Sequence, residues 1–404
     1  MKILFLTDNF PPEVNAPATR TYEHCRQWVK QGVDVTVITC IPNFPNPKLF
    51  TGYKNKLYQK EVVDGIKVIR VWSYIAENKG YRKRLLDFIS YAVMAFFAGL
   101  FVKTDIIIGT SPQFFTPVSA RCLSFVKRRP WVMEVRDLWP ESIAAVGMLE
   151  KTSTTYRWLE KVERHLYKSA NLIVPVTISF KVYISELVKD AEKIKVITNG
   201  VDRSKFVARE KDEKLIKELG LEGKFLVGYI GTLGMAHALD FILECAKAIT
   251  DENIVILIQG DGAKKGPLIA KAHRENISNV MFLPFAKKDK IGNYISILDV
   301  ALVNLKKSRT FLSVIPSKIF ENASMEKPIL HGVAGESKAI IEKYNAGIAF
   351  DPENKEEFLT ALREMKEKAK IGYFKKGSRK LANDFDRAKL ANHMLKSIKQ
   401  LLNK

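Results

Sequence analysis

Short apolar runs alternate with amphipathic helical patterns along the whole of this chain. Many of the runs are continuous stretches of valine, isoleucine and leucine, which is the pattern of parallel strands covered by helices on both faces. The strands predicted in the first half cover residues 3–7, 34–39, 68–72, 105–109, 131–135, 171–176 and 195–198. Those predicted in the second half cover residues 225–230, 254–259, 280–283, 300–303, 329–331 and 347–350.

Two successive β/α series predict an α/β protein built from two doubly wound, Rossmann-like domains that face a cleft. We place the junction at Asn199-Gly200-Val201-Asp202, because an Asn-Gly turn ends the first series there. The first domain is therefore expected over residues 1–202 and the second over 203–386. The amphipathic pattern of residues 388–402 has no strand after it. It predicts a C-terminal helix, within 387–404, that packs back on the first domain.

The segment 308–330, SRTFLSVIPSKIFENASMEKPIL, has the most informative pattern. It predicts a helix that begins at Pro316, since proline fits the first helical turn, and that ends at Lys327-Pro328. Free N–H groups and the helix dipole favour a phosphate at such a start. One turn further on, Glu321 can accept hydrogen bonds from the vicinal hydroxyls of a ribose. Phosphate and sugar diol together indicate a nucleotide.

Size and cysteine content place the chain among intracellular globular proteins. Its 404 residues, 47% of them hydrophobic, are enough for two separate cores. The four cysteines lie far apart without a CxxC pair, which argues against a disulfide framework and a zinc site and fits a reducing cytosol. The N-terminus, MKILFLTDNF, turns polar after a short apolar run and is better explained by a first strand than by a signal peptide.

The net charge of +21 has three explanations: a nucleic-acid partner, an anionic membrane, or simple solubility. No zinc-finger spacing or RNP-like aromatic motif supports nucleic acid. Two basic clusters stand out, residues 79–84 and Lys127-Arg128-Arg129. The first directly precedes the most apolar stretch of the chain, and this position favours an anionic membrane surface.

That apolar stretch covers residues 85–102 and has no charged side chain after position 87. A helix of the uncharged part reaches only about 22 Å, short of a roughly 30 Å hydrocarbon core, so a spanning helix is not expected. Either the helix is buried in the first domain, or it lies in the membrane interface with Arg82, Lys83 and Arg84 on anionic lipid. We favour the interface.

Several short motifs resemble one known family almost from end to end of the chain. They are Phe10-Pro11-Pro12, Gly32-Val33-Asp34-Val35, Asn199-Gly200-Val201-Asp202, Gly231-Thr232-Leu233, Gly260-Asp261-Gly262 and residues 316–321. Together they resemble GT-B glycosyltransferases of the retaining family 4. Residues 137–142 and 315–321 are similar to a narrower subgroup that builds O-antigen and capsule repeat units, including N-acetylfucosamine transferases like WbuB.

The resemblance implies a cytoplasmic enzyme, peripheral on the inner face of the cell membrane. It would move a sugar, with retention, from a nucleotide diphosphate, expected to be UDP, to a polyprenyl-diphosphate-linked glycan. The nucleotide would lie in the second domain and the acceptor over the first. No cofactor and no metal is expected, because fixed N–H groups and cations can stabilise the departing diphosphate. We read Asp384-Phe385-Asp386 as capping and packing residues, not as a metal site.

Three departures from the family pattern affect the expected site. Ser313 stands where the first glutamate of a Glu-x7-Glu pair is usual, with Glu321 as the second. Thr232 and His237 occupy the loop that commonly carries arginine and lysine. Lys318 and Arg309, with Lys306 behind them, are the nearest replacement cations. Asn15-Ala16-Pro17-Ala18 replaces the usual glycine pair of the first domain's opening loop.

The expected site combines donor-binding and catalytic residues. The donor-binding residues are Glu321, Lys318, Ser317, Ile315, Ser313, Arg309, Gly231, Thr232, His237, Gly260, Phe285 and Asn15. The catalytic residues are Asp137 and Arg136, which follow a predicted strand at its carboxyl end.

Structural alternatives stand beside these roles. Asp137 could be a helix N-cap, Arg136 could pair with Glu134 or Glu141, and Gly260 could serve only a tight turn. Two other functions also remain open: a nucleotide-sugar 2-epimerase on the same fold, and a non-catalytic nucleotide-sugar or anionic-polymer binding protein.

Overall fold

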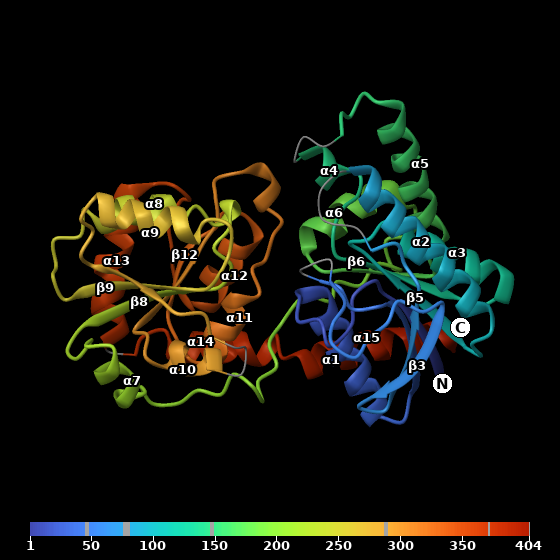
Figure 1. The fold of residues 1–404 in the computed structure, drawn as a ribbon, viewed down its shortest axis with the longest axis horizontal. Helices are drawn as coiled ribbons and strands as arrows, with labels where there is room; N and C mark the ends of the chain where they lie inside the picture. Colours follow the sequence, from blue (N-terminus) through green and yellow to red (C-terminus); the bar gives the residue numbers. More distant parts are fainter. Residues whose placement is uncertain (45–47, 76–80, 146–148, 287–289, 371, 404) are drawn as a thin grey trace. The chain divides into compact units, whose positions relative to one another are not determined.

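The computed structural model describes residues 1–44, 48–75, 81–145, 149–286, 290–370 and 372–403 (Figure 1). It divides into two compact units. The first unit contains Met1–Thr198 and Arg387–Lys404, and the second contains Asn199–Asp386. Two doubly wound α/β domains are thus confirmed. The first stretch of unit one ends at Thr198, four residues before the boundary at 202 that the sequence predicts.

The first unit is built on a seven-stranded sheet of order β3-β4-β2-β1-β5-β6-β7. Only β3 runs antiparallel to its neighbour among the described pairs. The strands are β1 Lys2–Leu6, β2 Asp34–Cys40, β3 Tyr58–Val63, β4 Ile66–Val71, β5 Ile106–Thr110, β6 Trp131–Val135 and β7 Leu172–Pro175. The order reverses between β1 and β5, and open α/β sheets bind ligands at this position.

Helices cover both faces of this sheet because successive side chains of each strand point to opposite sides. In β1, Ile3 and Phe5 pack with α1 and α15, whereas Leu4 and Leu6 pack in the core that contains α2 and α3. The helices are α1 Ala16–Lys30, α2 Tyr81–Leu100, α3 Phe115–Lys127, α4 Glu141–Ala145, α5 Thr154–Ser169, α6 Ile178–Leu187 and α15 Arg387–Leu402. The predicted return of the C-terminal helix is confirmed: Trp28 Nε1 donates to the Ala391 carbonyl at 2.8 Å.

The second unit has a six-stranded parallel sheet of order β10-β9-β8-β11-β12-β13, which reverses between β8 and β11. Its strands are β8 Phe225–Ile230, β9 Ile254–Gln259, β10 Val280–Leu283, β11 Val300–Asn304, β12 Ile329–Gly332 and β13 Gly347–Ala349. Its helices are α7 Glu213–Glu218, α8 Leu239–Ala246, α9 Lys265–Arg274, α10 Ile291–Ser296, α11 Lys318–Ser324, α12 Glu336–Tyr344, α13 Lys355–Lys370 and α14 Lys375–Asp384.

Three predicted details are wrong. Residues 195–198 form no strand, although Lys195 and Ile197 donate backbone hydrogen bonds to Ile173 and Pro175 in β7. The edge strand β3 was not predicted, because its alternating polar side chains lack the buried Val/Ile/Leu pattern. The helix expected from Pro316 begins two residues later, at Lys318, and has seven residues. A helix this short has little dipole to offer a phosphate, so the Lys318 side chain is the stronger candidate for that contact.

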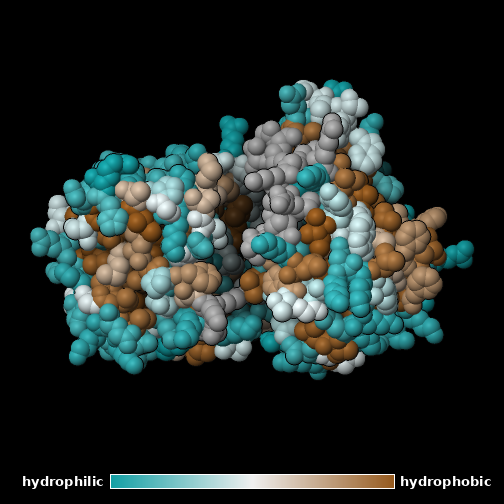
Figure 2. Space-filling view, viewed as in Figure 1, coloured by the Kyte–Doolittle hydropathy of each residue, from teal (hydrophilic) through white to brown (hydrophobic). Residues whose placement is uncertain are grey.

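Helix α2 is buried on one side only, so burial in the first domain accounts for one of its faces, and the membrane interface stays a prediction. Tyr91, Ala95 and Ala98 are buried against the sheet and α3. The opposite face exposes the apolar side chains Leu86, Ile89, Val93 and Phe97. In Figure 2, apolar side chains gather over the region of α2 and α3. No helix in the described ranges has both the length and the apolar character needed to cross a bilayer.

Candidate active site

The second unit holds a buried cation at the carboxyl edge of its sheet. Lys318 is the first residue of α11, and its Nζ lies 3.8 Å from the centre of the Tyr229 ring at the end of β8. This nitrogen is buried and has no hydrogen-bond partner among the residues that the structure describes. Burial lowers the pKa of Lys318 to about 7, while Glu321 one turn later opposes the shift. Because an isolated buried ammonium is costly, this position favours an anionic ligand.

Two glycines bring backbone close to this ammonium. Gly231 has φ +148°, and a side-chain Cβ there would lie 2.8 Å from Lys318 Nζ. Gly260 has φ +150°, and a Cβ there would lie 1.7 Å from the Gly231 carbonyl oxygen. Neither position accommodates a larger residue. Gly231 therefore borders the site, and Gly260 packs directly against Gly231, while a donor contact of Gly260 stays a prediction.

His237 is a neutral group beside the same cation. Its ring centre lies 5.8 Å from that of Tyr229, and its carbonyl accepts a hydrogen bond of 2.9 Å from Asn304 at the end of β11. Burial, and then the Lys318 charge, lower the pKa of His237 to about 4. Its Nδ1 is buried without a partner among the described residues. A neutral imidazole at neutral pH can offer an N–H donor but no positive charge.

The remaining predicted donor residues of this unit fall into two groups. Glu321, Ser317, Ser313, Thr232, Arg309 and Phe285 all keep exposed or partly exposed side chains on loops or helix ends after the strands. Ile315 does not: its side chain is 7% exposed and packs in the core with Phe320 and Val333. The prediction that the Ile315 side chain binds the donor is therefore wrong, and only its backbone remains available for a contact. Arg309 lines a separate recess with Lys306 and Asp351.

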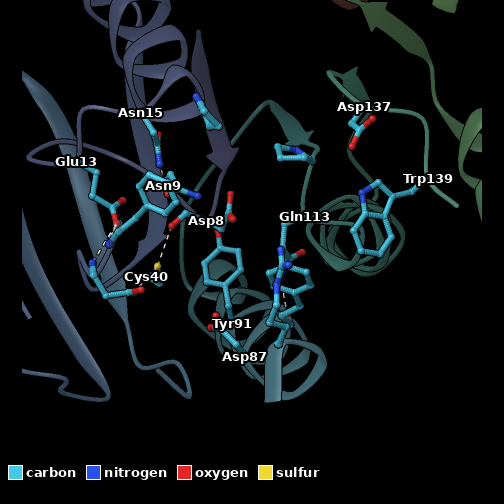
Figure 3. Close-up of a pocket in the computed structure, with 16 residues that line it drawn as sticks. Asp8, Asn9, Glu13, Asn15, Cys40, Asp87, Tyr91, Gln113, Asp137 and Trp139 are labelled. Carbon is cyan, nitrogen blue, oxygen red and sulfur yellow. Dashed lines mark hydrogen bonds between the residues drawn. The ribbon is translucent and has the colours of Figure 1, made fainter. Parts of the chain in front are cut away.

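The first unit has a pocket of about 330 Å³ at the carboxyl ends of its central strands (Figure 3). In Figure 3, Asp8, Tyr91 and Asp87 lie in its middle, with Asp137 and Trp139 at one end. Asn15 lines the other end, where it caps α1 and also donates to Asn9 at 2.6 Å. The predicted contact between Asn15 and the sugar-donor substrate would therefore have to compete with these two hydrogen bonds.

Carboxylates dominate the chemistry of this pocket. Burial raises the pKa values of Asp8 and Glu13, and it raises that of Asp87 to about 7. Glu13 accepts backbone hydrogen bonds from Phe10, Asn43 and Phe44, so its role is to hold a loop. Asp8 Oδ1 is buried without a partner among the described residues. Asp8 and Asp87 can thus accept hydrogen bonds from ligand hydroxyls, and neither was among the predicted site residues.

Asp137 and Arg136 follow β6 at the edge of this pocket. Their backbone N–H groups both donate to Ser111 Oγ, at 3.1 and 2.7 Å. Asp137 lies four residues before α4 and is therefore not its N-cap. Burial raises the pKa of its carboxyl, which lines the pocket.

Arg136 does not form either of the ion pairs considered for it. Glu134 bonds Arg20 at 2.9 Å, and Glu141 bonds Lys151 at 2.6 Å. Arg136 Nε and Nη1 are buried without hydrogen-bond partners in the part of the chain that the structure describes. Burial lowers the pKa of Arg136 to about 10, so the group stays cationic at neutral pH. The Arg136 guanidinium is therefore a second buried cation that can bind a phosphate.

The two doubly wound units have the fold of GT-B glycosyltransferase structures, and the class itself rests on family models. Two family models match the chain, "Glycosyltransferase Family 4" over residues 17–205 and "Glycosyl transferases group 1" over residues 211–383. The chain belongs to glycosyltransferase family 4. The narrower WbuB-like subgroup stays a prediction.

Curated relatives and solved structures agree with this class. The chain is 26% identical to the putative colanic acid biosynthesis glycosyl transferase WcaI of Escherichia coli K12, over 79% of this chain and 80% of the relative. It is 27% identical to the probable glycosyltransferase WbjE of Pseudomonas aeruginosa, over 56% and 57%. Sucrose-phosphate synthase of Thermosynechococcus elongatus superposes with a TM-score of 0.79 at 12% identity, covering 100% of this chain and 99% of that one. Anabaena HepE in complex with UDP superposes with a TM-score of 0.71 at 17% sequence identity, covering 99% of this chain and 100% of that one. At these identities the structures show the fold alone.

Proposed function

We propose that this enzyme transfers a sugar from a UDP-sugar to a polyprenyl-diphosphate-linked glycan during surface polysaccharide synthesis, with retention at the anomeric carbon. The observation that carries the proposal is Lys318, a buried ammonium without a hydrogen-bond partner among the described residues, beside a glycine turn at the switch point of a parallel sheet. This is the chemistry that a nucleotide diphosphate requires.

The relatives support the biological setting of the proposal. WcaI carries the description colanic acid biosynthesis, and TuaH of Bacillus subtilis carries teichuronic acid biosynthesis. HepE, which has the same fold, was crystallised with UDP and with UDP-glucose. We therefore extend synthesis of a surface polysaccharide, such as O-antigen or capsule, and UDP as the nucleotide, to this chain. An N-acetylated amino sugar is the proposed donor sugar.

The proposed chemistry follows the charge that develops during transfer. The bond between the anomeric carbon and the diphosphate oxygen breaks, and its electron pair stays on the diphosphate. Lys318, the N–H groups of the loop after β8 and the His237 imidazole stabilise that charge without a metal ion. The acceptor hydroxyl forms the new bond on the face of the anomeric carbon that the diphosphate leaves, as retention requires, and its proton passes to the departing diphosphate oxygen. We assign Asp137 to orienting this hydroxyl and Arg136 to a phosphate.

Glu321 is proposed to accept hydrogen bonds from the ribose hydroxyls. Glu321→Ala should weaken UDP binding roughly tenfold, since hydrogen bonds to a charged group contribute about 1.5–3 kcal/mol. Isothermal titration calorimetry measures the change. Glu342→Ala, on the exposed face of α12, is the matched control and should bind like wild type. An unaltered dissociation constant for Glu321→Ala refutes the ribose contact.

UDP affinity is also expected to fall as the pH rises above 7. Free Lys318 has a pKa of about 7, and a bound diphosphate raises it, so binding takes up a proton between the two pKa values. Each pH unit above 7 should then weaken binding by up to about tenfold. Titrations between pH 7 and 9 test this, and Lys318→Met should flatten the dependence. Wild-type affinity that is constant over this range contradicts the assignment.

Incubation with nucleotide sugars, with and without polyprenyl-diphosphate-linked glycan, tests the proposed reaction. We expect sugar transfer only when both substrates are present. Epimerised donor without acceptor would indicate the 2-epimerase instead, and binding without turnover would indicate a non-catalytic binding protein. A thermal-shift screen of nucleoside diphosphates identifies the base, with UDP expected to give the largest shift.

A further inference from the structure

Helix α2 separates the acidic pocket from an exposed apolar surface. Arg84, Asp87, Phe88 and Tyr91 line the pocket. Leu86, Ile89, Val93 and Phe97 follow one another at intervals of three and four residues, so they share the other face of the helix. All four are exposed to solvent. A row of exposed apolar side chains along one helix face is typical of an interaction surface.

The fold extends this apolar face with the end of α3. Lys127 Nζ donates to the Leu100 carbonyl at 2.8 Å, which joins the C-terminal ends of α2 and α3. Beside this junction, Phe101 is 88% exposed and Phe125 is 73% exposed, and Val126 is also exposed. We call this surface the α2–α3 face. It consists of Leu86, Ile89, Val93, Phe97, Phe101, Phe125 and Val126.

Positive charge borders the α2–α3 face at this junction. Lys103, Arg128 and Arg129 are exposed next to Phe101 and Phe125 in the chain. The only acidic residue of the described helices α2 and α3 is Asp87, which lines the pocket on the opposite side. The fold thereby places the basic cluster Lys127-Arg128-Arg129 beside the apolar stretch 85–102, although the two are separated in the sequence.

We propose that the α2–α3 face docks on an anionic lipid bilayer, with Phe101 and Phe125 entering the interface and Lys103, Arg128 and Arg129 contacting lipid phosphates. The inference rests on the proposed function in one respect, because a lipid-linked acceptor requires the enzyme at a membrane. Exposed aromatic side chains bordered by basic residues match the interfacial region of a bilayer, where apolar insertion and attraction to anionic lipid act together. A second copy of this chain would bring the same positive charges together and is therefore disfavoured.

This surface differs from the basic flank that the sequence predicts. Of that flank, residues 79 and 80 and the side chains of Tyr81 and Arg82 lie outside the described residues, while Lys83 and Arg84 are exposed. The structure adds the opposite end of α2 and the end of α3. Because α2 lines the acidic pocket with its other face, a glycan in the pocket can remain attached to a lipid in the bilayer.

Vesicle co-sedimentation of the full chain tests the proposal. The vesicles contain phosphatidylcholine alone, or phosphatidylcholine and phosphatidylglycerol in equal amounts. Wild type should bind the anionic vesicles at least tenfold more tightly than the neutral ones, and salt should weaken this binding. Phe101→Ser/Phe125→Ser should lower the affinity by about tenfold or more. Lys103→Gln/Arg128→Asn/Arg129→Gln should bind the anionic vesicles no better than the neutral ones.

Matched variants in and beside the edge strand β3 of the same sheet control for lost apolar area and lost charge. Leu57→Ser/Val62→Ser removes two apolar side chains exposed by about 70% each, and Lys54→Gln/Lys56→Gln/Lys60→Gln removes three exposed charges. Both should bind vesicles like wild type. The proposal is overturned if the α2–α3 variants bind like wild type, if the controls lose as much binding, or if wild type forms a dimer through this face and ignores vesicles.

The UDP thermal shift of each variant separates this proposal from the proposed function. We expect it to equal that of wild type, because the substituted residues lie outside the donor site. Vesicle binding without any nucleotide binding would refute the proposed function and leave the docking surface standing. Nucleotide binding and transfer to a soluble glycan without vesicle binding would refute the docking surface and leave the proposed sugar transfer standing.

Discussion

Lys318→Met is expected to weaken UDP binding by about a hundredfold and, at the same time, to raise the melting temperature of the free protein by roughly 2–4 °C. Charge-assisted hydrogen bonds to the diphosphate account for about 2–3 kcal/mol of binding. Without ligand, the same ammonium is buried over the Tyr229 ring with no hydrogen-bond partner among the described residues. Methionine removes that cost and keeps contact with the ring.

Calorimetry and thermal unfolding measure the two effects separately. Lys306→Met is the matched control, because Lys306 is exposed after β11 and was only a reserve candidate for the diphosphate. It should change UDP affinity by less than about threefold, as is usual for an exposed charge. If Lys318→Met binds UDP as wild type does, or loses affinity only because it melts at a lower temperature, Lys318 is not the diphosphate ligand.

Glu134→Ala is expected to destabilise the first unit by about 3–5 kcal/mol, the usual cost of leaving a buried charge without its partner. Glu134 lies within β6, bonds Arg20 at 2.9 Å and accepts from Thr110 at 2.6 Å. Burial raises the pKa of Glu134, but Arg20 and Arg136 outweigh this and hold it below the ordinary value. The variant leaves both arginines in a buried region without this carboxylate.

Chemical denaturation followed by circular dichroism measures this loss. Glu141→Ala, which breaks the exposed pair with Lys151, should cost no more than about 1 kcal/mol. The contribution of Glu134 should be present at neutral pH and disappear as the pH falls through its lowered pKa. Equal stability losses in the two variants would show that Glu134 has no special structural role.

The strands could be predicted because their signal is local. β6, β8, β9 and β10 have the predicted bounds, since each is a continuous apolar run between turns. The edge strand β3 alternates exposed and half-buried side chains, and its pairing with β4 depends on a distant strand that the local pattern does not contain. Residues 195–198 show the converse error: the segment lies beside β7 and donates two backbone hydrogen bonds to it but does not form a strand.

The residues of the candidate site could be predicted better than the burial and contacts of their side chains. Lys318, His237 and Gly231 were named from motifs, and the structure brings them together around Tyr229. The burial of Ile315 depends on which side of a short turn faces the core, which a motif does not specify. Asp8 and Asp87 could have been found: one directly follows the first strand, and the other is the only charge within the apolar stretch 85–102.

Transfer of labelled sugar from UDP-sugars to a polyprenyl-diphosphate-linked glycan tests the central claim most directly. Wild type should convert one UDP-sugar into labelled, lipid-extractable product, and Lys318→Met should lose at least about 99% of this transfer at donor concentrations below the wild-type KM, matching its expected hundredfold loss of UDP affinity. The account is contradicted if Lys318→Met transfers sugar as fast as wild type, or if no UDP-sugar yields product with any lipid-linked acceptor.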